Sequence, residues 1–183
     1  KDILNLVYIA NYYGLDELAK YWQQVLDLNK WQKQRISRII INNLFGTLYE
    51  KKIAILGFAF KAETNDTRES PAIDICKDLL EEGAQLSIYD PKVSSIQIST
   101  DLEISENNES KAGSWISAAS VEDAAKHSDA IIVITEWAEF KNLDWKKISR
   151  LMRFPAWLFD LRRITNIEKA KKHGFNTWYL GSP

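Results

Sequence analysis

Residues 53–71 read IAILGFAFKAETNDTRESP, and this stretch decides the fold class. The short apolar run at 53–56 is bounded by lysines before it and by Gly57 after it, as expected for a buried parallel strand. Ser70 and Pro71 then mark the start of a helix, because serine caps a helix N-terminus and proline suits the first helical position. A strand, a loop and a helix in this order predict the first half of a βαβ unit.

The alternation of strands and helices continues to the C-terminus. The helix after Pro71 has one apolar face and is expected to end at Gly83. Such alternation predicts an α/β fold in which a mostly parallel sheet of about six strands is flanked by helices. Residues 94–114, rich in Ser, Glu and Asn, are interpreted as a surface excursion. The other strands are expected at 86–89, 115–116, 131–134, 157–159 and 175–179, and the other helices at 121–127 and 165–173.

The N-terminal part of the chain predicts helices of a different kind. The segment before Gly14 is apolar nearly all round, a pattern typical of a buried helix. After this stop, a longer helix is expected from about Asp16 to Gly46. About 30 residues of helix span roughly 45 Å, which exceeds the diameter of a small domain. This helix should therefore link two bodies or pack against another chain.

Composition excludes several classes of protein. Lys and Arg total 24 against 25 Asp and Glu, whereas nucleic-acid-binding domains usually carry a basic excess, so nucleic acid is not expected as a partner. One Cys and two His provide neither an internal disulfide nor a plausible structural metal set. No apolar run approaches the roughly 18 residues of a membrane span, and the first residues do not resemble a signal peptide. We expect a cytoplasmic protein without membrane contact, and the start at Lys1 within a helical pattern suggests a longer parent chain.

The loop after the first strand is the best candidate for ligand binding, because ligands bind outside the carboxyl ends of parallel strands. It occupies the place of a dinucleotide fingerprint but lacks the second and third glycines, and Phe58 and Phe60 should block close approach of a pyrophosphate. Lys61 and Arg68 add cations near a helix N-terminus. These residues alone predict only a phosphorylated ligand, and basic loop residues are more often simply solvated.

Several separated motifs that occur in the right order are more specific than any one of them. Together they resemble the UDP-glucose/GDP-mannose dehydrogenase family, and the similarity covers essentially the whole chain. The matching segments are Tyr21-Trp22-Gln23-Gln24-Val25, Gly57-x-x-Phe60-Lys61-x-x-Thr64-x-Asp66-x-Arg68-x-Ser70-Pro71, Tyr89-Asp90-Pro91, Thr135-Glu136-Trp137 and Phe159-Asp160-x-Arg162-Arg163.

This resemblance implies a domain organisation and an activity. Residues 50–183 would form a Rossmann-like UDP-binding domain, and residues 1–49 the end of a central helical dimerisation domain. The implied reaction oxidises the C6 alcohol of UDP-glucose to UDP-glucuronate with two NAD, held mainly by another domain, so the chain alone is expected to be inactive. The implied assembly is a homodimer or higher homo-oligomer through the long helix. GDP-mannose or a UDP-N-acetylhexosamine is an alternative substrate, and a non-catalytic nucleotide-binding or dimerisation module is the rival reading.

The resemblance also implies roles for single residues in the substrate site. Phe60 and Lys61 would contact the nucleotide sugar, with Lys61 near its phosphates, and Arg162 would belong to the same site. Arg68 would reach towards NAD. Leu161 departs from the family, whose members often have glycine there, and a branched side chain restricts the backbone. The aim of Arg162 is therefore in question.

The resemblance places the catalytic segment at the very start of the chain. Lys1 and Asp2 match its last two residues, and Asp2 would position a catalytic water. The nucleophilic cysteine of the family would lie just upstream of Lys1 and would carry the sugar as a covalent adduct.

Other reactive side chains have simpler interpretations. Cys76 lies on the apolar face of its helix and is interpreted as a core thiol. His127 and His173 are expected at helix ends, where a cation suits the helix dipole. Asp90 fits a ribose-binding acid and an Asp-Pro turn equally well. Among the tryptophans, Trp137 is the one near a strand end.

Overall fold

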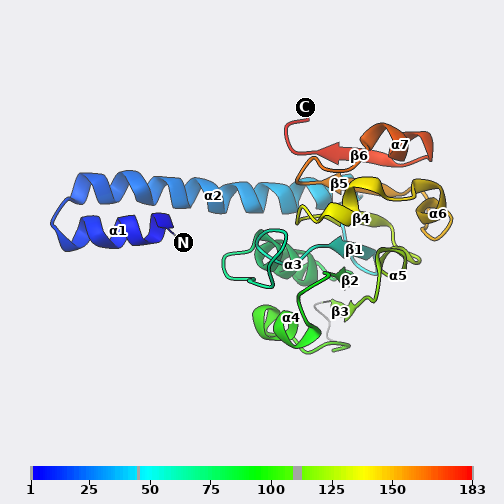
Figure 1. The fold of residues 1–183 in the computed structure, drawn as a ribbon, viewed down its shortest axis with the longest axis horizontal. Coiled ribbons are helices and arrows are strands. Elements are labelled where there is room, and N and C mark those ends of the chain that lie inside the picture. The colour runs from blue at the N-terminus through cyan, green and yellow to red at the C-terminus, as the bar shows by residue number, and fades with distance from the viewer. Residues whose placement is uncertain (1, 45, 109–112, 183) are drawn as a thin grey trace.

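The computed structural model describes residues 2–44, 46–108 and 113–182 of the 183. Helices and strands alternate along most of this length, as the sequence predicts (Figure 1). The elements are α1 (Asp2–Tyr12), α2 (Asp16–Asn43), β1 (Lys52–Leu56), α3 (Pro71–Glu81), β2 (Gln85–Tyr89), α4 (Ser95–Leu102), β3 (Ser114–Ser117), α5 (Val121–Ala125), β4 (Ala130–Val133), η1 (Ala138–Asn142), α6 (Trp145–Ser149), β5 (Trp157–Asp160), α7 (Ile167–Lys172) and β6 (Asn176–Tyr179).

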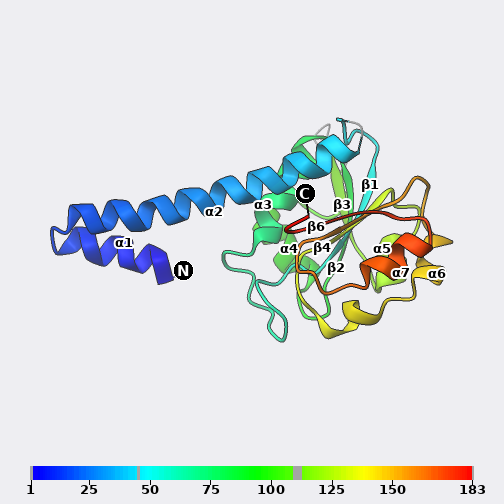
Figure 2. The ribbon, with the colours of Figure 1, turned by 90° about the horizontal axis from the view of Figure 1, so that it is seen from above.

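Within the described residues, six strands form one sheet in the order β3-β2-β1-β4-β5-β6, and every neighbouring pair is parallel. The predicted α/β class is therefore confirmed. Helices α3 and α4 and the end of α2 lie on one side of the sheet, and α5, α6 and α7 lie on the other (Figure 2). Strand order reverses between β1 and β4, and ligands of doubly wound sheets bind at the carboxyl ends of strands beside such a reversal.

Helix α3 begins as its sequence predicts. The Ser70 Oγ accepts a hydrogen bond from the N–H of Ala72 at 3.2 Å, and Pro71 takes the first helical position. The apolar face of α3 is buried, and it includes Cys76. Burial raises the pKa of the Cys76 thiol far above its ordinary value. The interpretation of Cys76 as a core thiol is therefore confirmed.

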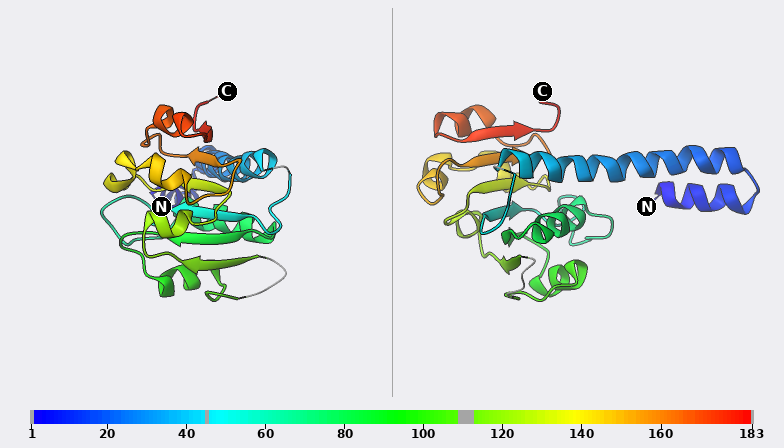
Figure 3. Two further views of the ribbon diagram at one scale, coloured as in Figure 1. Left: turned by 90° about the vertical axis from the view of Figure 1, so that its right-hand side faces the viewer. Right: turned by 180° about the vertical axis from the view of Figure 1, so that it is seen from behind.

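The predicted long helix is present as α2, and its two halves have different surroundings. Its C-terminal half packs into the core through Ile36 and Ile40 and is tied to α3 by two polar contacts. Lys33 Nζ lies 2.6 Å from Asp74 Oδ2, and the Ser37 hydroxyl donates to Asp78 Oδ2 at 2.6 Å. The N-terminal half projects beyond the α/β body, and α1 folds back along it (Figure 3). No helix in the described part of the chain has both the length and the hydropathy that crossing a bilayer requires.

Helix α1 contradicts one expectation from the sequence. The segment was expected to be a buried helix, but Ala10 is its single buried residue among those described, and Tyr8 and Tyr12 are 71% and 73% exposed. The physical reason is that α1 packs mainly against α2, which covers only one side of a helix that is apolar nearly all round.

The segment 94–114 also differs from its interpretation as a surface excursion. It contains α4, whose Ile98 and Leu102 are buried in the core four residues apart. Ser94 caps this helix by accepting the N–H of Gln97. The polar residues around Ile98 and Leu102 made these two core positions difficult to recognise in the sequence. Residues 109–112 lie outside the described residues.

Candidate functional site

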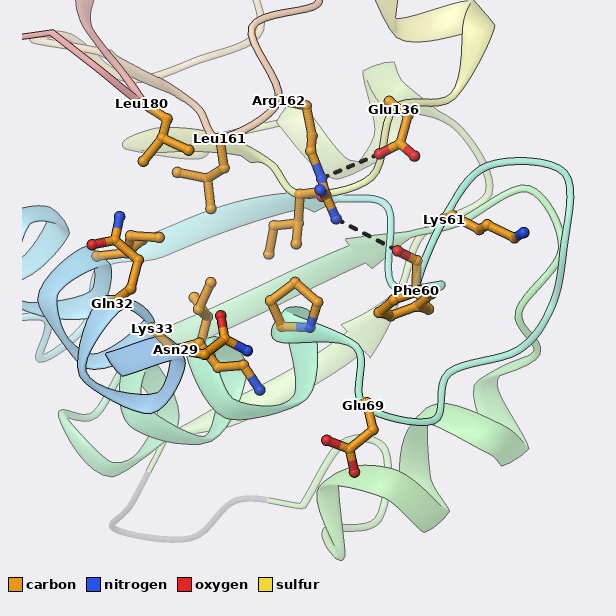
Figure 4. A pocket seen from close by; sticks show the side chains of 14 residues that line it. Asn29, Gln32, Lys33, Phe60, Lys61, Glu69, Glu136, Leu161, Arg162 and Leu180 are labelled. Atoms are coloured by element: carbon orange, nitrogen blue, oxygen red, sulfur yellow. Dashed lines mark hydrogen bonds and ion pairs between the residues drawn. The ribbon is translucent and has the colours of Figure 1, made fainter. Parts of the chain in front are cut away.

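A pocket of about 370 Å³ lies at the carboxyl ends of β1, β4, β5 and β6, beside α2 (Figure 4). Its lining is apolar at Ile75, Ile134 and Leu161, and polar groups stand around these side chains. A concave, mostly apolar surface with a few convergent polar groups is typical of small-molecule sites. The polar groups are Asn29, Gln32 and Lys33 of α2, Lys61 and Glu69 of the loop after β1, Glu136 after β4 and Arg162 after β5.

Arg162 joins the ends of three strands. Its Nε donates to the carbonyl oxygen of Ile134 at 2.6 Å and lies 3.2 Å from Oε2 of Glu136. Its Nη2 donates to the carbonyl oxygen of Phe60 at 3.5 Å (Figure 4). These contacts hold the guanidinium at the wall of the pocket, where it is only partly exposed.

Phe60 and Lys61 belong to the same pocket lining but point in different directions. Phe60 is 47% exposed and borders the pocket, and its backbone N–H donates to the carbonyl oxygen of Asp66 at 2.9 Å. The Lys61 side chain extends away from Arg162, past the rim of the pocket (Figure 4). The structure thus brings the three residues expected at the nucleotide sugar to one place.

Leu161 does not disturb the backbone as the sequence suggested. Its side chain is buried and contributes to the pocket, and its N–H donates to the carbonyl oxygen of Val133 at 3.0 Å. The left-handed conformation occurs instead at Arg163, with φ of 55°. The backbone of Arg162 is fixed because its N–H donates to Oδ1 of Asp160 at 3.0 Å.

The first loop does not provide a cradle for a dinucleotide such as NAD. Gly57 matches the first fingerprint glycine, but Ala59 and Ala62 stand in place of the other two, and Asp90 turns towards this loop. Its Oδ2 accepts hydrogen bonds from the N–H groups of Phe58 at 2.7 Å and Ala59 at 3.0 Å. Asp90 is therefore not presented to a ribose, and the turn interpretation is the correct one of the two. Arg68 lies outside the pocket lining and pairs with Asp66, with 2.7 Å between Nη2 and Oδ2.

A second pocket, of about 520 Å³, lies along α2 next to the first and shares Asn29 and Gln32 with it. Ile3 of α1 lines this second pocket, so Asp2, which is exposed, lies close to its edge. The first turn of α1 points towards the loop after β1 in the views that show the helical arm from the side (Figures 1 and 2, and Figure 3, right). Lys1 lies outside the described residues. Among the described residues, no three acidic, His or Cys side chains form a group that could hold a metal ion.

Residues 54–167 match the family model described as "UDP-glucose/GDP-mannose dehydrogenase family, UDP binding domain". The chain belongs to this family. Its relatives include UDP-glucose 6-dehydrogenase 4 of Arabidopsis thaliana, 45% identical over all of this chain and 40% of that protein. UDP-glucose 6-dehydrogenase of Drosophila melanogaster is 47% identical over 99% of this chain and 39% of its own length. The chain thus spans about 40% of the length of these curated relatives.

Solved structures support the same fold for this member of the UDP-glucose/GDP-mannose dehydrogenase family. A UDP-glucose dehydrogenase from Pyrobaculum islandicum superposes with a TM-score of 0.68 at 21% identity, covering 98% of this chain and 35% of that one. An NDP-N-acetyl-D-galactosaminuronic acid dehydrogenase from Methanosarcina mazei Go1 also gives 0.68, at 18% identity, covering 90% of this chain and 31% of that one.

Five polar residues of the pocket in this dehydrogenase-family chain were not predicted from the sequence: Asn29, Gln32, Lys33, Glu69 and Glu136. Glu136 was visible as part of the Thr135-Glu136-Trp137 motif, and its place directly after β4 was the signal that could have identified it. Asn29 and Gln32 had no such signal, because their position depends on how α2 packs on the sheet. Trp137 proves to be structural: it is buried, and its Nε1 donates to Oδ2 of Asp90 at 3.1 Å.

Proposed function

We propose that this chain forms the nucleotide-binding end of an NAD-dependent UDP-glucose 6-dehydrogenase, a cytoplasmic enzyme that converts UDP-glucose to UDP-glucuronate. In this proposal residues 50–183 are the UDP-binding domain and residues 1–49 belong to a helical dimerisation domain. The observation that carries the proposal is the pocket at the strand ends, where Phe60, Lys61 and Arg162 come together in a chain of this family.

The chemistry of the pocket suits a uridine diphosphate. Arg162 uses Nε and one Nη2 hydrogen on the carbonyl oxygens of Ile134 and Phe60, which leaves the Nη1 side of its guanidinium as the donor for phosphate oxygens. Lys61 offers a point charge at the rim of the pocket. The half-exposed ring of Phe60 offers an apolar surface beside them. The amides of Asn29 and Gln32 can both donate and accept hydrogen bonds, as recognition of sugar hydroxyls requires.

The second pocket would take the sugar end of the substrate. It continues the first along α2 towards the start of α1, where Asp2 is proposed to orient the hydrolytic water. NAD is proposed as the oxidant of the whole enzyme, and the described residues do not form its cradle. Arg68 remains the candidate contact to NAD, because its guanidinium is largely exposed.

A protein of residues 1–183 is expected to produce no NADH from UDP-glucose and NAD. Its single cysteine, Cys76, is fully buried with a raised pKa, and the loop after β1 offers no dinucleotide cradle. Absorbance of NADH, with a full-length relative assayed in parallel, checks this expectation. Turnover above the blank, including turnover that persists in Cys76→Ser, would contradict the proposal that the nucleophile and the NAD cradle belong to another part of the enzyme.

We also expect two copies of this chain to associate across residues 16–46. Large apolar side chains on this projecting helix, such as Leu18 and Tyr21, are 45% and 58% exposed, and contiguous apolar surface of this kind marks interfaces. Sedimentation at high micromolar concentration should show a dimer. Leu18→Glu should shift it towards monomer, whereas Gln24→Glu, a charge added at an exposed polar position, should not. A strictly monomeric wild type would count against this interface.

A further inference from the structure

The backbone turn at Phe58 and Ala59 is held by side chains from three other parts of the chain. Asp90 Oδ2 accepts hydrogen bonds from both N–H groups, at 2.7 and 3.0 Å. The carbonyl oxygen of Phe58 accepts from the Ser70 hydroxyl at 2.7 Å, and that of Ala59 accepts from the Thr135 hydroxyl at 2.7 Å. Both turn residues are completely buried. Each polar backbone group of this turn is therefore satisfied by a side chain.

Asp90 supplies the negative charge at the centre of this arrangement. Besides the two turn N–H groups, its Oδ2 accepts from Trp137 Nε1 at 3.1 Å. Its Oδ1 accepts from the N–H groups of Lys92 at 2.9 Å and Val93 at 3.0 Å. Two successive N–H groups that converge on one oxygen form an anion-binding nest. Here the anion in the nest is part of the chain itself.

The filled nest lies where a dinucleotide-binding domain keeps its phosphate site. In such domains the first βα turn carries the pyrophosphate, next to the reversal of strand order. In this chain the turn is pressed against the end of β4: a Cβ added to Gly57 would lie 2.4 Å from Cβ of Thr135. With Asp90 inside and Thr135 alongside, the turn has neither free donors nor room for an external phosphate.

The turn leads directly into the pocket at the strand ends. Phe60 and Lys61 follow Ala59 in the chain, and both line that pocket. The carbonyl oxygen of Phe60 also accepts from Nη2 of Arg162 at 3.5 Å. The direction in which this segment leaves the turn therefore decides where the Phe60 ring and the base of the Lys61 side chain stand.

We propose that Asp90 is a positioning residue of the nucleotide site: it acts as a built-in anion that occupies the phosphate nest of the fold and sets the Phe60–Lys61 segment at the pocket. The binding of Asp90 in the nest involves this chain alone and does not depend on which ligand the pocket binds. The positioning of the ligand contacts rests on the proposed function, the binding of UDP. The two parts need separate measurements.

The first measurement tests the nest without any nucleotide. Asp90→Ala leaves the N–H groups of Phe58 and Ala59 buried without their acceptor, and sodium formate supplies a free carboxylate that can enter the vacated place. Formate should raise the Tm of Asp90→Ala and shift the amide NMR resonances of Phe58 and Ala59, whereas sodium chloride at equal ionic strength should do neither. Wild type and Asp27→Ala, which removes an exposed carboxylate from α2, should not respond. A formate-insensitive Asp90→Ala overturns the proposal.

A second variant keeps the proposal testable if Asp90→Ala does not fold. Asp90→Asn preserves the shape of the side chain but replaces one accepting oxygen with a donor. The amides of Phe58 and Ala59 should exchange faster with solvent in this variant, and formate should not slow them because the side chain still fills the nest. If the amides of Phe58 and Ala59 exchange as slowly in Asp90→Asn as in wild type, no anion is needed to hold the turn, and the proposal is overturned.

The final measurement is UDP binding by calorimetry. Asp90→Ala should bind UDP at least roughly tenfold more weakly than wild type, and formate should restore most of the affinity. Formate binding in the nest together with no UDP binding by wild type would refute the proposed function while leaving the built-in anion intact. Unchanged UDP affinity in Asp90→Ala, with or without formate, would overturn the positioning role.

Discussion

Substitution of Gly57 by alanine is expected to destabilise the fold by roughly 2–5 kcal/mol, through a left-handed backbone and overpacking together. Gly57 has φ of 90°, and a Cβ there would lie 2.4 Å from Cβ and 2.8 Å from the backbone nitrogen of Thr135. The second contact is with backbone, which cannot turn aside as a flexible side chain can. The midpoint of urea unfolding, followed by circular dichroism, measures the loss.

Gly46 provides the matched control for this prediction. Its φ is 75°, and among the described residues no atom lies within 4 Å of a Cβ added there. Gly46→Ala should therefore cost only the backbone part, roughly 1–2 kcal/mol. Equal losses for the two variants would show that the contact between the β1 turn and the end of β4 is not as tight as described.

The second large effect concerns UDP binding by the residues at the strand ends. A hydrogen bond to a charged group is worth roughly 1.5–3 kcal/mol, so Lys61→Ala and Arg162→Ala should each weaken UDP binding roughly 10- to 150-fold. Arg162→Ala should affect recognition of the nucleotide more than that of the sugar. Isothermal titration calorimetry with UDP and UDP-glucose measures both effects.

Two controls distinguish a direct contact between Lys61 and a phosphate from a general effect of positive charge: the dependence on salt, and a second lysine outside the pocket. The loss in Lys61→Ala should shrink as salt rises, because the ammonium is exposed and salt screens exposed charges. Lys126→Ala, an exposed lysine at the end of α5, should leave UDP binding unchanged. If folded Lys61→Ala and Arg162→Ala both bind UDP within about twofold of wild type, which is below 0.5 kcal/mol, the phosphates bind elsewhere.

The fold could be predicted from the sequence wherever the deciding signals are local. The run 53–56, Gly57 and the Ser70-Pro71 pair each act within a few residues, and they correctly placed β1, the turn and α3. Helix α4 was missed because two core residues, four positions apart, anchor a segment that is otherwise polar. The exposure of α1 could not be predicted either, since apolar residues on all sides do not show which side has a neighbour.

The site residues also divide into those that local sequence signals predict and those that depend on tertiary packing. Residues in the loops that follow strands, such as Lys61 and Arg162, could be assigned to one edge because parallel strands end together. Asn29 and Gln32 could not, since their place in the pocket follows from the packing of α2 against α3. The inward turn of Asp90 was also beyond sequence reasoning, because the sequence was equally compatible with a ribose-binding acid.

Calorimetric titration of residues 1–183 with UDP, GDP and NAD measures whether the pocket at the strand ends binds UDP. UDP should bind at one site per chain, GDP should bind more weakly, NAD should not bind, and Arg162→Ala should lower the UDP affinity. Binding of NAD without binding of UDP would contradict both proposals, because the nest filled by Asp90 would then be open and the pocket at the strand ends would have another ligand.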